Sequence, residues 1–164
     1  MQTQLAITPS MTQKTNRQRG FFVAPLLISV AVVLALAGAA YGIYQYASNV
    51  YTTNIENSNL MSIVSAAKSL KSGGSYTSVD NAALQRIKAF GGMTGAAVGG
   101  TVRNRWNGTV VVTGTASQLE IVYNGVPTSA CDRFLTMATN SGEFAAPLPT
   151  CSATAASDLT FIAY

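Results

Sequence analysis

The sequence predicts an α+β protein in which a long N-terminal hydrophobic and amphipathic helix packs on a small antiparallel β-sheet. Three observations predict this class: an uncharged apolar run that passes into a helical pattern, short strand-like runs separated by Asn-Gly pairs, and two cysteines in the last third of the chain. The chain has 164 residues, enough for one domain plus an extension but not for two full domains.

The composition limits the functions to consider. Hydrophobic residues make up 48% and charged residues 10%, whereas an ordinary soluble protein has about a quarter charged residues. The net charge is +4, but residues 21–164 hold seven basic and six acidic side chains, so a nucleic-acid partner is not expected. Histidine is absent, which excludes Ser-His-Asp and Cys-His catalysis and histidine-containing zinc sites. The acidic residues show no paired-carboxylate spacing, and we expect no enzyme activity, cofactor or metal.

A basic N-terminus precedes a long uncharged segment. No charged side chain occurs between Arg19 and Glu56, and residues 21–44 are apolar over about the length of a membrane-spanning helix. The preceding Lys14, Arg17 and Arg19 predict that the N-terminus stays in the cytoplasm and that the chain after this segment is exported.

Two other interpretations of the apolar segment stay open. It could be a buried core helix, or a secretory signal peptide cut near Ala39 or Ala40. A retained helix is favoured because helix-compatible sequence continues through Ser72 without a proline.

The apolar run continues as an amphipathic helix over residues 48–72. Its apolar residues recur at helical spacing, at Leu60, Ile63, Val64, Ala67 and Leu70. Gly73 and Gly74 then predict the end of the helix. We expect one helix over residues 21–72 or, alternatively, two helices broken near Gly42 or within residues 49–59.

A short capped helix and a glycine-rich loop are expected next. Thr77-Ser78-Val79-Asp80 is followed by Ala83, Leu84, Ile87 and Phe90, which is typical of a short capped helix. Residues 91–100 form a glycine-rich loop, but no Lys-Ser/Thr pair follows, so phosphate binding is not expected.

The second half of the chain predicts an antiparallel meander. Residues 101–106 and 109–113 flank Asn107-Gly108, a pair typical of a tight hairpin turn. Residues 118–123 alternate between polar and apolar side chains, which predicts a further strand. Asn107 also begins a glycosylation acceptor pattern, although the turn explains the pair without a sugar.

One helix and one strand complete the expected fold. Residues 127–139 predict a helix opened by Pro127, and residues 159–164 predict a terminal strand. Cys131 and Cys151 lie in the part expected to be exported, where an even number of cysteines favours a disulfide.

Four tyrosines, Tyr41, Tyr44, Tyr46 and Tyr51, cluster where the helix would leave a membrane. They suit either an interfacial aromatic belt or packing within an assembly.

Taken together, these segments resemble a known family. A basic leader ending in Arg19-Gly20, an immediate Phe21-Phe22, the long helix and a small α+β domain with a C-terminal disulfide resemble a type IV prepilin. The leader of twenty residues resembles those of the type IVb branch. The run from Trp106 to Cys131 is similar to the major pilins of conjugative thin pili and bundle-forming pili.

The resemblance implies the type IV pilin fold and a division into three parts. Residues 1–20 would be the leader peptide, residues 21–47 the transmembrane and filament-core half of the helix, and residues 48–164 the exported globular pilin domain. A prepilin peptidase would cut between Gly20 and Phe21, and the new Phe21 amino group would be methylated. One position departs from the family, which usually carries glutamate where this chain has Pro25.

The function implied is that of a structural subunit of a type IVb pilus used in adhesion or conjugation. The subunit would wait in the bacterial inner membrane and then polymerise through its N-terminal helix into an extracellular homo-oligomeric filament. Its partners would be the prepilin peptidase and the pilus assembly machinery. The alternatives are a minor pilin, a type II secretion pseudopilin, or a secreted binding domain released by signal peptidase.

Overall fold

The computed structural model describes the backbone of residues 23–164 and the side chains of residues 26–164. Gly20 and Phe21, the predicted cleavage site, lie outside the described residues. Contacts divide the chain into two compact units, Met1–Ile43 and Tyr44–Tyr164.

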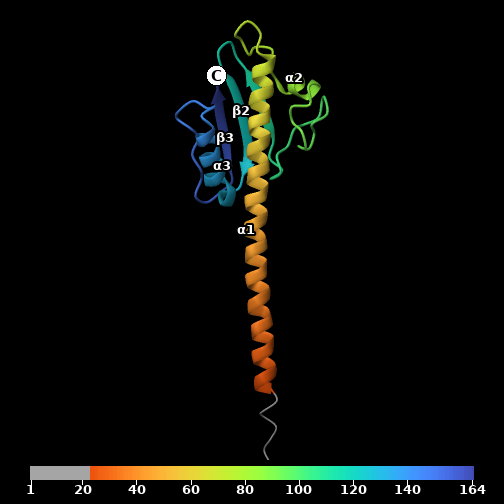
Figure 1. Cartoon of the computed structure of the whole chain (residues 1–164), viewed down its shortest axis with the longest axis vertical. Coiled ribbons are helices and arrows are strands. Elements are labelled where there is room, and N and C mark those ends of the chain that lie inside the picture. Colours follow the sequence, from red (N-terminus) through yellow and green to blue (C-terminus); the bar gives the residue numbers. More distant parts are fainter. Residues whose placement is uncertain (1–22) are drawn as a thin grey trace, which may run out of the picture. The chain divides into compact units, whose positions relative to one another are not determined.

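The first element is the helix α1, which extends over Val23–Leu70 (Figure 1). The prediction of a single helix is confirmed over these residues, and the alternative of a break near Gly42 or within residues 49–59 is wrong. Pro25 is the third residue of α1, in the first turn, where a missing N–H costs little because it has no intrahelical acceptor. The helix ends ahead of Gly73, whose φ of 57° is left-handed.

Within the second unit, α1 buries one face against the rest of the domain. Leu60, Ile63 and Ala67 are fully buried, and they recur at the spacing that places side chains on one side of a helix. Figure 1 shows this part of α1 lying along the sheet. The fold is therefore a long apolar helix packed on a small antiparallel sheet, as predicted.

The sheet contains three antiparallel strands in the order β1-β2-β3. These are β1 (Val110–Gly114), β2 (Leu119–Val126) and β3 (Ser157–Ala163). Ile121 of β2 lies opposite Val112 of β1 and Phe161 of β3. Alternate residues of every strand are buried, which is the pattern of a sheet with one face on the core.

The expected hairpin is shorter than the sequence predicts. Residues 101–106 do not form a regular strand, and only Arg103 bridges to Thr109. The chain turns earlier because the Asn104 carboxamide oxygen accepts the backbone N–H groups of Trp106 (3.0 Å) and Gly108 (2.9 Å). Asn107 nevertheless has the positive φ, 68°, that its place in a tight turn predicts.

Two short helices flank α1 in the second unit. The helix α2 (Asn81–Arg86) begins with the predicted cap, because the Asp80 carboxylate accepts the N–H of Ala83 at 2.7 Å. The helix α3 (Thr128–Ser141) follows Pro127 and ends at Gly142. Figure 1 shows α2 on one side of α1 and α3 on the other.

An aromatic cluster joins α3 to the sheet. Phe134 of α3 has its ring centre 5.3 Å from that of Tyr123 on β2 and 5.6 Å from that of Phe161 on β3. Trp106 packs edge-on against Phe134 at 5.6 Å. Such pairs add to the stabilisation that burial of the rings provides.

Both edges of the sheet are covered by other parts of the chain. On the β1 side, the Asn81 side chain donates to the Val110 carbonyl (2.9 Å) and accepts the Val112 N–H (2.6 Å). On the β3 side, the Ala145 N–H donates to the Ile162 carbonyl at 2.8 Å. The edge groups that could pair with a foreign strand are thus partly occupied.

Candidate functional site

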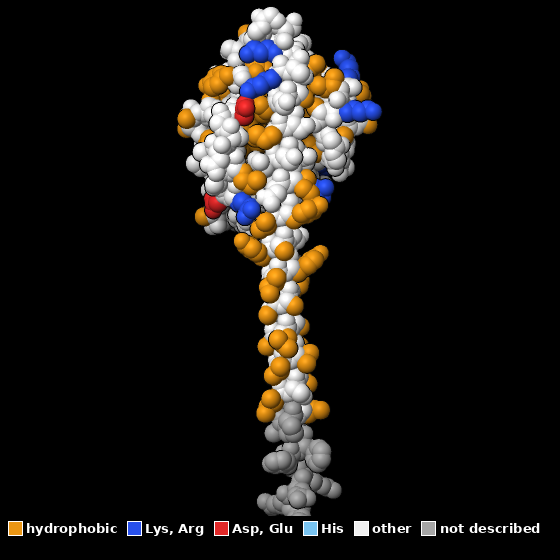
Figure 2. All heavy atoms as spheres, in the orientation of Figure 1, with side chains coloured by type: hydrophobic (Ala, Val, Ile, Leu, Met, Phe, Trp, Pro, Cys, Tyr) orange, Lys and Arg blue, Asp and Glu red, His pale blue; other side chains and the backbone are white. Residues whose placement is uncertain are grey.

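The exposed half of α1 is the most unusual surface of the molecule. Every residue from 26 to 48 is exposed, including Leu34 at 67%, Leu36 at 66% and Ile43 at 71% of their full accessible surface. Figure 2 shows hydrophobic side chains projecting from both sides of this half. Burying a side chain of this size is worth about 1.5–3 kcal/mol, so the segment requires lipid or other apolar protein around it.

The segment meets the length and composition of a membrane-spanning helix. The candidate span lies within Leu26–Leu70, and none of its most apolar window is buried by the rest of the chain. The alternative of a buried core helix is therefore wrong for this segment. A signal sequence near an N-terminus meets the same length and composition. The position at which the chain is cleaved distinguishes a retained helix from a removed signal peptide.

The four predicted tyrosines lie at the change from apolar to polar sequence along α1. Tyr41, Tyr44, Tyr46 and Tyr51 are all exposed. Their rings are apolar and their hydroxyls polar, which suits a position between hydrocarbon and water or between packed helices.

A buried carboxylate fastens the start of the folded part of α1 to the loop before β1. Glu56 is fully buried, and its Oε1 accepts the Arg105 backbone N–H at 2.9 Å. Burial raises the pKa of the Glu56 carboxyl above its ordinary value, while the hydrogen bonds from Arg105 and Asn59 and the Arg105 charge oppose this.

Further polar groups are buried in the same unit without a hydrogen bond among the described residues. They are Oε2 of Glu56, Oδ1 of Asn57, Nε1 of Trp106 and the hydroxyl of Tyr123. Burial and the Glu56 charge raise the pKa of Tyr123 well above its ordinary value, so this hydroxyl stays protonated.

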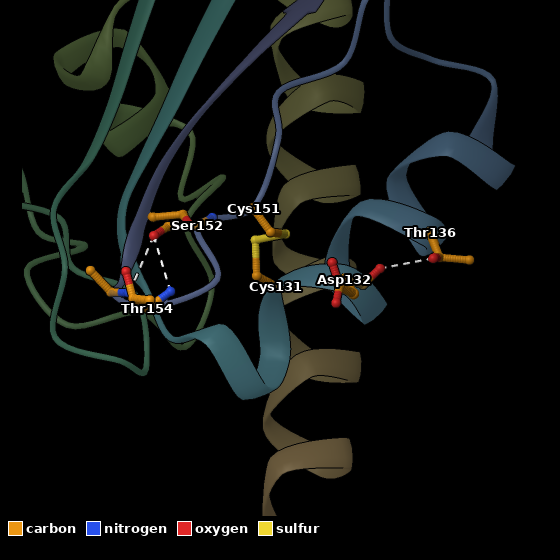
Figure 3. The surroundings of a disulfide bond; sticks show 8 residues. Cys131, Asp132, Thr136, Cys151, Ser152 and Thr154 are labelled. Atoms are coloured by element: carbon orange, nitrogen blue, oxygen red, sulfur yellow. Dashed lines mark hydrogen bonds between the residues drawn. A yellow bond between two sulfur atoms is a disulfide. The ribbon is translucent and has the colours of Figure 1, made fainter.

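The predicted disulfide is present in the structure. Cys131 on α3 is bonded to Cys151, with 5.9 Å between the two Cα atoms and 20 residues of separation. Figure 3 shows that the bond joins the first turns of α3 to the segment that leads into β3. Next to it, the Ser157 hydroxyl accepts the Ser152 N–H at 2.8 Å. The disulfide therefore closes the chain just ahead of the last strand.

The glycine-rich loop is held by one buried side chain. The Gln85 carboxamide donates to the carbonyls of Gly95 (2.9 Å) and Gly100 (2.7 Å) and accepts the Gly99 N–H (3.1 Å). A Cβ on Gly95 would lie 2.0 Å from the Thr101 carbonyl oxygen, so glycine is required there. The loop is an ordered structural element.

The structure describes some of the predicted site residues and not others. Cys131 and Cys151 are bonded, Pro25 lies in α1, and Gly20 and Phe21 are outside the described residues. No group of three possible metal ligands occurs among the residues that the structure describes.

Sequence reasoning missed the buried Glu56, although a signal for it was available. Glu56 lies four and seven residues before Leu60 and Ile63, so the helical period places it on the buried face. Asn104 also had a local signal, because its side chain accepts N–H groups two and four residues on. The role of Gln85 had no comparable local signal.

Among the comparisons with known proteins, a family model matches the chain. A family model described as PilS N terminal matches residues 50–160, which is 111 of 164 residues. No curated protein and no solved structure matches the chain.

Proposed function

Because the chain belongs to the PilS N-terminal family of type IV pilin-like proteins, we propose that it is a structural subunit of a type IVb pilus. In this proposal a prepilin peptidase removes residues 1–20, and residues 21–47 hold the subunit in the bacterial inner membrane. The subunit then polymerises into an extracellular filament used in adhesion or conjugation. Its role is structural and not catalytic.

The observation that carries the proposal is the pairing of two contrasting surfaces on one helix. Residues 26–48 of α1 are exposed all around, whereas Leu60, Ile63 and Ala67 of the same helix are fully buried in the folded unit. A helix that is apolar on every face can leave lipid only where other apolar surface replaces the lipid. A bundle of identical helices supplies that surface, which supports a filament with α1 at its core.

In the proposed mature chain, no carboxylate lies near the N-terminal amino group of Phe21. In the pilin family a glutamate at the place of Pro25 offsets the amino-terminal charge of a neighbouring subunit. Here the first acidic residue is Glu56, and it is buried within its own domain. The Phe21 amino group would therefore be satisfied by backbone carbonyls or by lipid headgroups, and its methylation keeps the positive charge.

The mature N-terminus tests the proposal. Mass spectrometry of the protein recovered from sheared cell-surface filaments should find a chain that begins at Phe21 with a methylated amino group. A start near Ala40 or Tyr41 would contradict the pilin and favour a secreted domain released by signal peptidase.

Two matched variants sharpen this test. Gly20→Val should leave the uncut precursor in the inner membrane and abolish filaments, because a bulky branched side chain then precedes the proposed cut. Ala39→Val lies at the alternative cut, and it should leave processing between Gly20 and Phe21 unchanged.

A further inference from the structure

Two Asn-Gly pairs lie against each other in the folded unit. They are Asn107-Gly108, in the turn before β1, and Asn124-Gly125, at the irregularity in the pairing of β2 with β3. A Cβ atom added to Gly108 would lie 1.6 Å from the Asn124 carbonyl oxygen, and one added to Gly125 would lie 3.4 Å from the Cα of Gly108. The fold therefore brings the two pairs into contact.

The fold requires glycine in both pairs. No side chain fits at Gly108, because the Asn124 carbonyl occupies the place of its Cβ atom. Gly125 has a φ of 69°, in the left-handed region that glycine adopts without strain. Each asparagine is therefore followed by a residue that cannot be exchanged for a larger one without cost.

This requirement has a chemical consequence, because glycine offers no side chain to hinder deamidation of the preceding asparagine. In that reaction the glycine backbone nitrogen attacks the side-chain carbonyl carbon of the asparagine, and a C–N bond closes a succinimide ring. The nitrogen gives its proton to solvent, and the side-chain amide leaves as ammonia. Water then opens the ring and produces aspartate or isoaspartate. The reaction therefore needs a glycine N–H group that is free to lose its proton.

Both glycine N–H groups are held by side-chain oxygens. The Gly108 N–H donates to Oδ1 of Asn104 at 2.9 Å, and the Gly125 N–H donates to Oδ1 of Asp158 at 2.9 Å. Asn104 is only 3% exposed, so water competes little for the first bond. Asp158 is exposed, but its charge strengthens the second bond and opposes a negative charge on the nitrogen.

Further hydrogen bonds restrain the same two pairs. The Asn104 carboxamide donates to the Asn124 carbonyl at 2.9 Å, so this one side chain contacts both pairs. The Asn124 carboxamide donates to the Thr109 hydroxyl at 2.7 Å, which engages the amide group that would leave as ammonia. The Asn107 side chain is exposed, so the restraint at that pair acts on the glycine nitrogen.

We propose that Asn107 and Asn124 are deamidation sites that the folded state protects, and that Asn104 and Asp158 are the protecting residues. The inference does not depend on the proposed function. Isoaspartate at Asn124 would add an extra atom to the main chain of β2, the strand that pairs with both β1 and β3. Protection of this site therefore preserves the sheet.

The test ages the full-length chain in detergent at neutral pH and follows each asparagine by peptide mass spectrometry. Conversion to aspartate or isoaspartate is read from the mass gain of an amide that becomes an acid. The same chain unfolded in urea with a reductant gives the unrestrained rates. The folded chain should convert at least about tenfold more slowly at Asn107 and Asn124, because a hydrogen bond must break before the attack.

Two matched variants at one position test the role of the carboxylate. Asp158→Ala removes the acceptor and should raise conversion at Asn124 by at least about fivefold, while conversion at Asn107 stays within about twofold. Asp158→Asn keeps an oxygen for the Gly125 N–H and should stay closer to the unaltered chain than Asp158→Ala does. Unchanged emission from the half-buried Trp106 shows that the variants are folded.

A third variant tests the other glycine nitrogen. Asn104→Ala frees the Gly108 N–H and should raise conversion at Asn107 by at least about fivefold. The buried Asn104 also accepts the Trp106 N–H, so this variant is compared with the others only if its Trp106 emission is unchanged. The two Asp158 variants decide the inference in either case.

Three results would overturn the inference. Equal rates in the folded and the unfolded chain would show that the fold gives no protection. An unchanged rate at Asn124 in Asp158→Ala would show that the carboxylate does not protect it. An equal rise at Asn107 and Asn124 in Asp158→Ala would indicate a general loosening of the domain and not the loss of one hydrogen bond. None of these results depends on filament assembly, so the proposed function is tested separately.

Discussion

The two halves of α1 share one helix but meet different surroundings. Residues 26–48 are exposed on every face. Farther along, Leu60, Ile63 and Ala67 are fully buried. The difference lies in how apolar residues are spread around the helix axis, all around in the first half and in one stripe in the second. The first half therefore needs an external apolar environment, whereas the second half completes its own domain.

The largest expected effect comes from separating the two halves. Removal of residues 1–48 should turn a detergent-requiring protein into a soluble, monomeric, folded domain, because the deleted half makes no part of the core. Circular dichroism and size-exclusion chromatography are the measurements. An unfolded or aggregated product would show that the buried half of α1 depends on the exposed half.

Equivalent truncations in the two halves should differ strongly. Leu60→Ala removes a fully buried side chain from the second half of α1 and should lower the free energy of unfolding by about 2–5 kcal/mol. Leu34→Ala in the exposed half should leave it unchanged within about 0.5 kcal/mol. Denaturation of the detergent-solubilised chain, followed by Trp106 fluorescence, compares the two. Equal losses would contradict the division of the helix.

Loss of the disulfide should weaken only the folded unit. Cys131→Ser opens a loop of 20 residues, whose closure stabilises the domain by about 3 kcal/mol. The folded unit should become protease-sensitive. Under the proposed function the filament yield should also fall, while the chain stays in the membrane fraction. A Cys131→Ser protein that resists protease as well as the unaltered chain would argue that β3 is held by packing alone.

The smallest expected effect is the pH dependence caused by Glu56. Since the pKa of this carboxyl is raised in the folded protein, the folded state binds the proton more tightly than the unfolded state. Its contribution is therefore complete below pH 4.5, the ordinary value, and is lost as the pH rises through the higher folded value.

Glu56→Gln keeps an acceptor for the Arg105 N–H and removes the titration. The variant should lose less stability than the unaltered chain between about pH 4 and pH 8. Unfolding by urea at a series of pH values measures this. Identical pH profiles would assign the dependence to other groups.

Local signals in the sequence were enough to predict most of the fold. The helical spacing of Leu60, Ile63 and Ala67, the Asp80 cap and the Asn107 turn each depend on residues a few positions apart, and the structure contains all three. The paired cysteines followed from export and an even count. The first three could be predicted because each depends on interactions between residues a few positions apart. The disulfide could be predicted because two cysteines allow a single pairing.

The parts that were missed depend on contacts between distant residues. Gln85 bonds to residues 10 to 15 positions away, and Glu56 bonds to Arg105 at a separation of 49. The Asn104 side chain also donates to the Asn124 carbonyl at a separation of 20. Such contacts form only once the fold has brought the partners together. The helical period could predict the burial of Glu56 but not its bond to Arg105.

In the proposed filament, the disulfide would have a mechanical consequence under tension. If pulling opened the domain, the chain between Cys131 and Cys151 could not straighten, because the covalent bond ties its ends. An extended chain gains at most roughly 3.5 Å per residue, so these 20 residues represent about 70 Å of length that stays stored whatever the load. A subunit unfolded by tension on the filament would then lengthen by a shorter distance. The strand β3 would stay close to β2, its partner in the folded sheet.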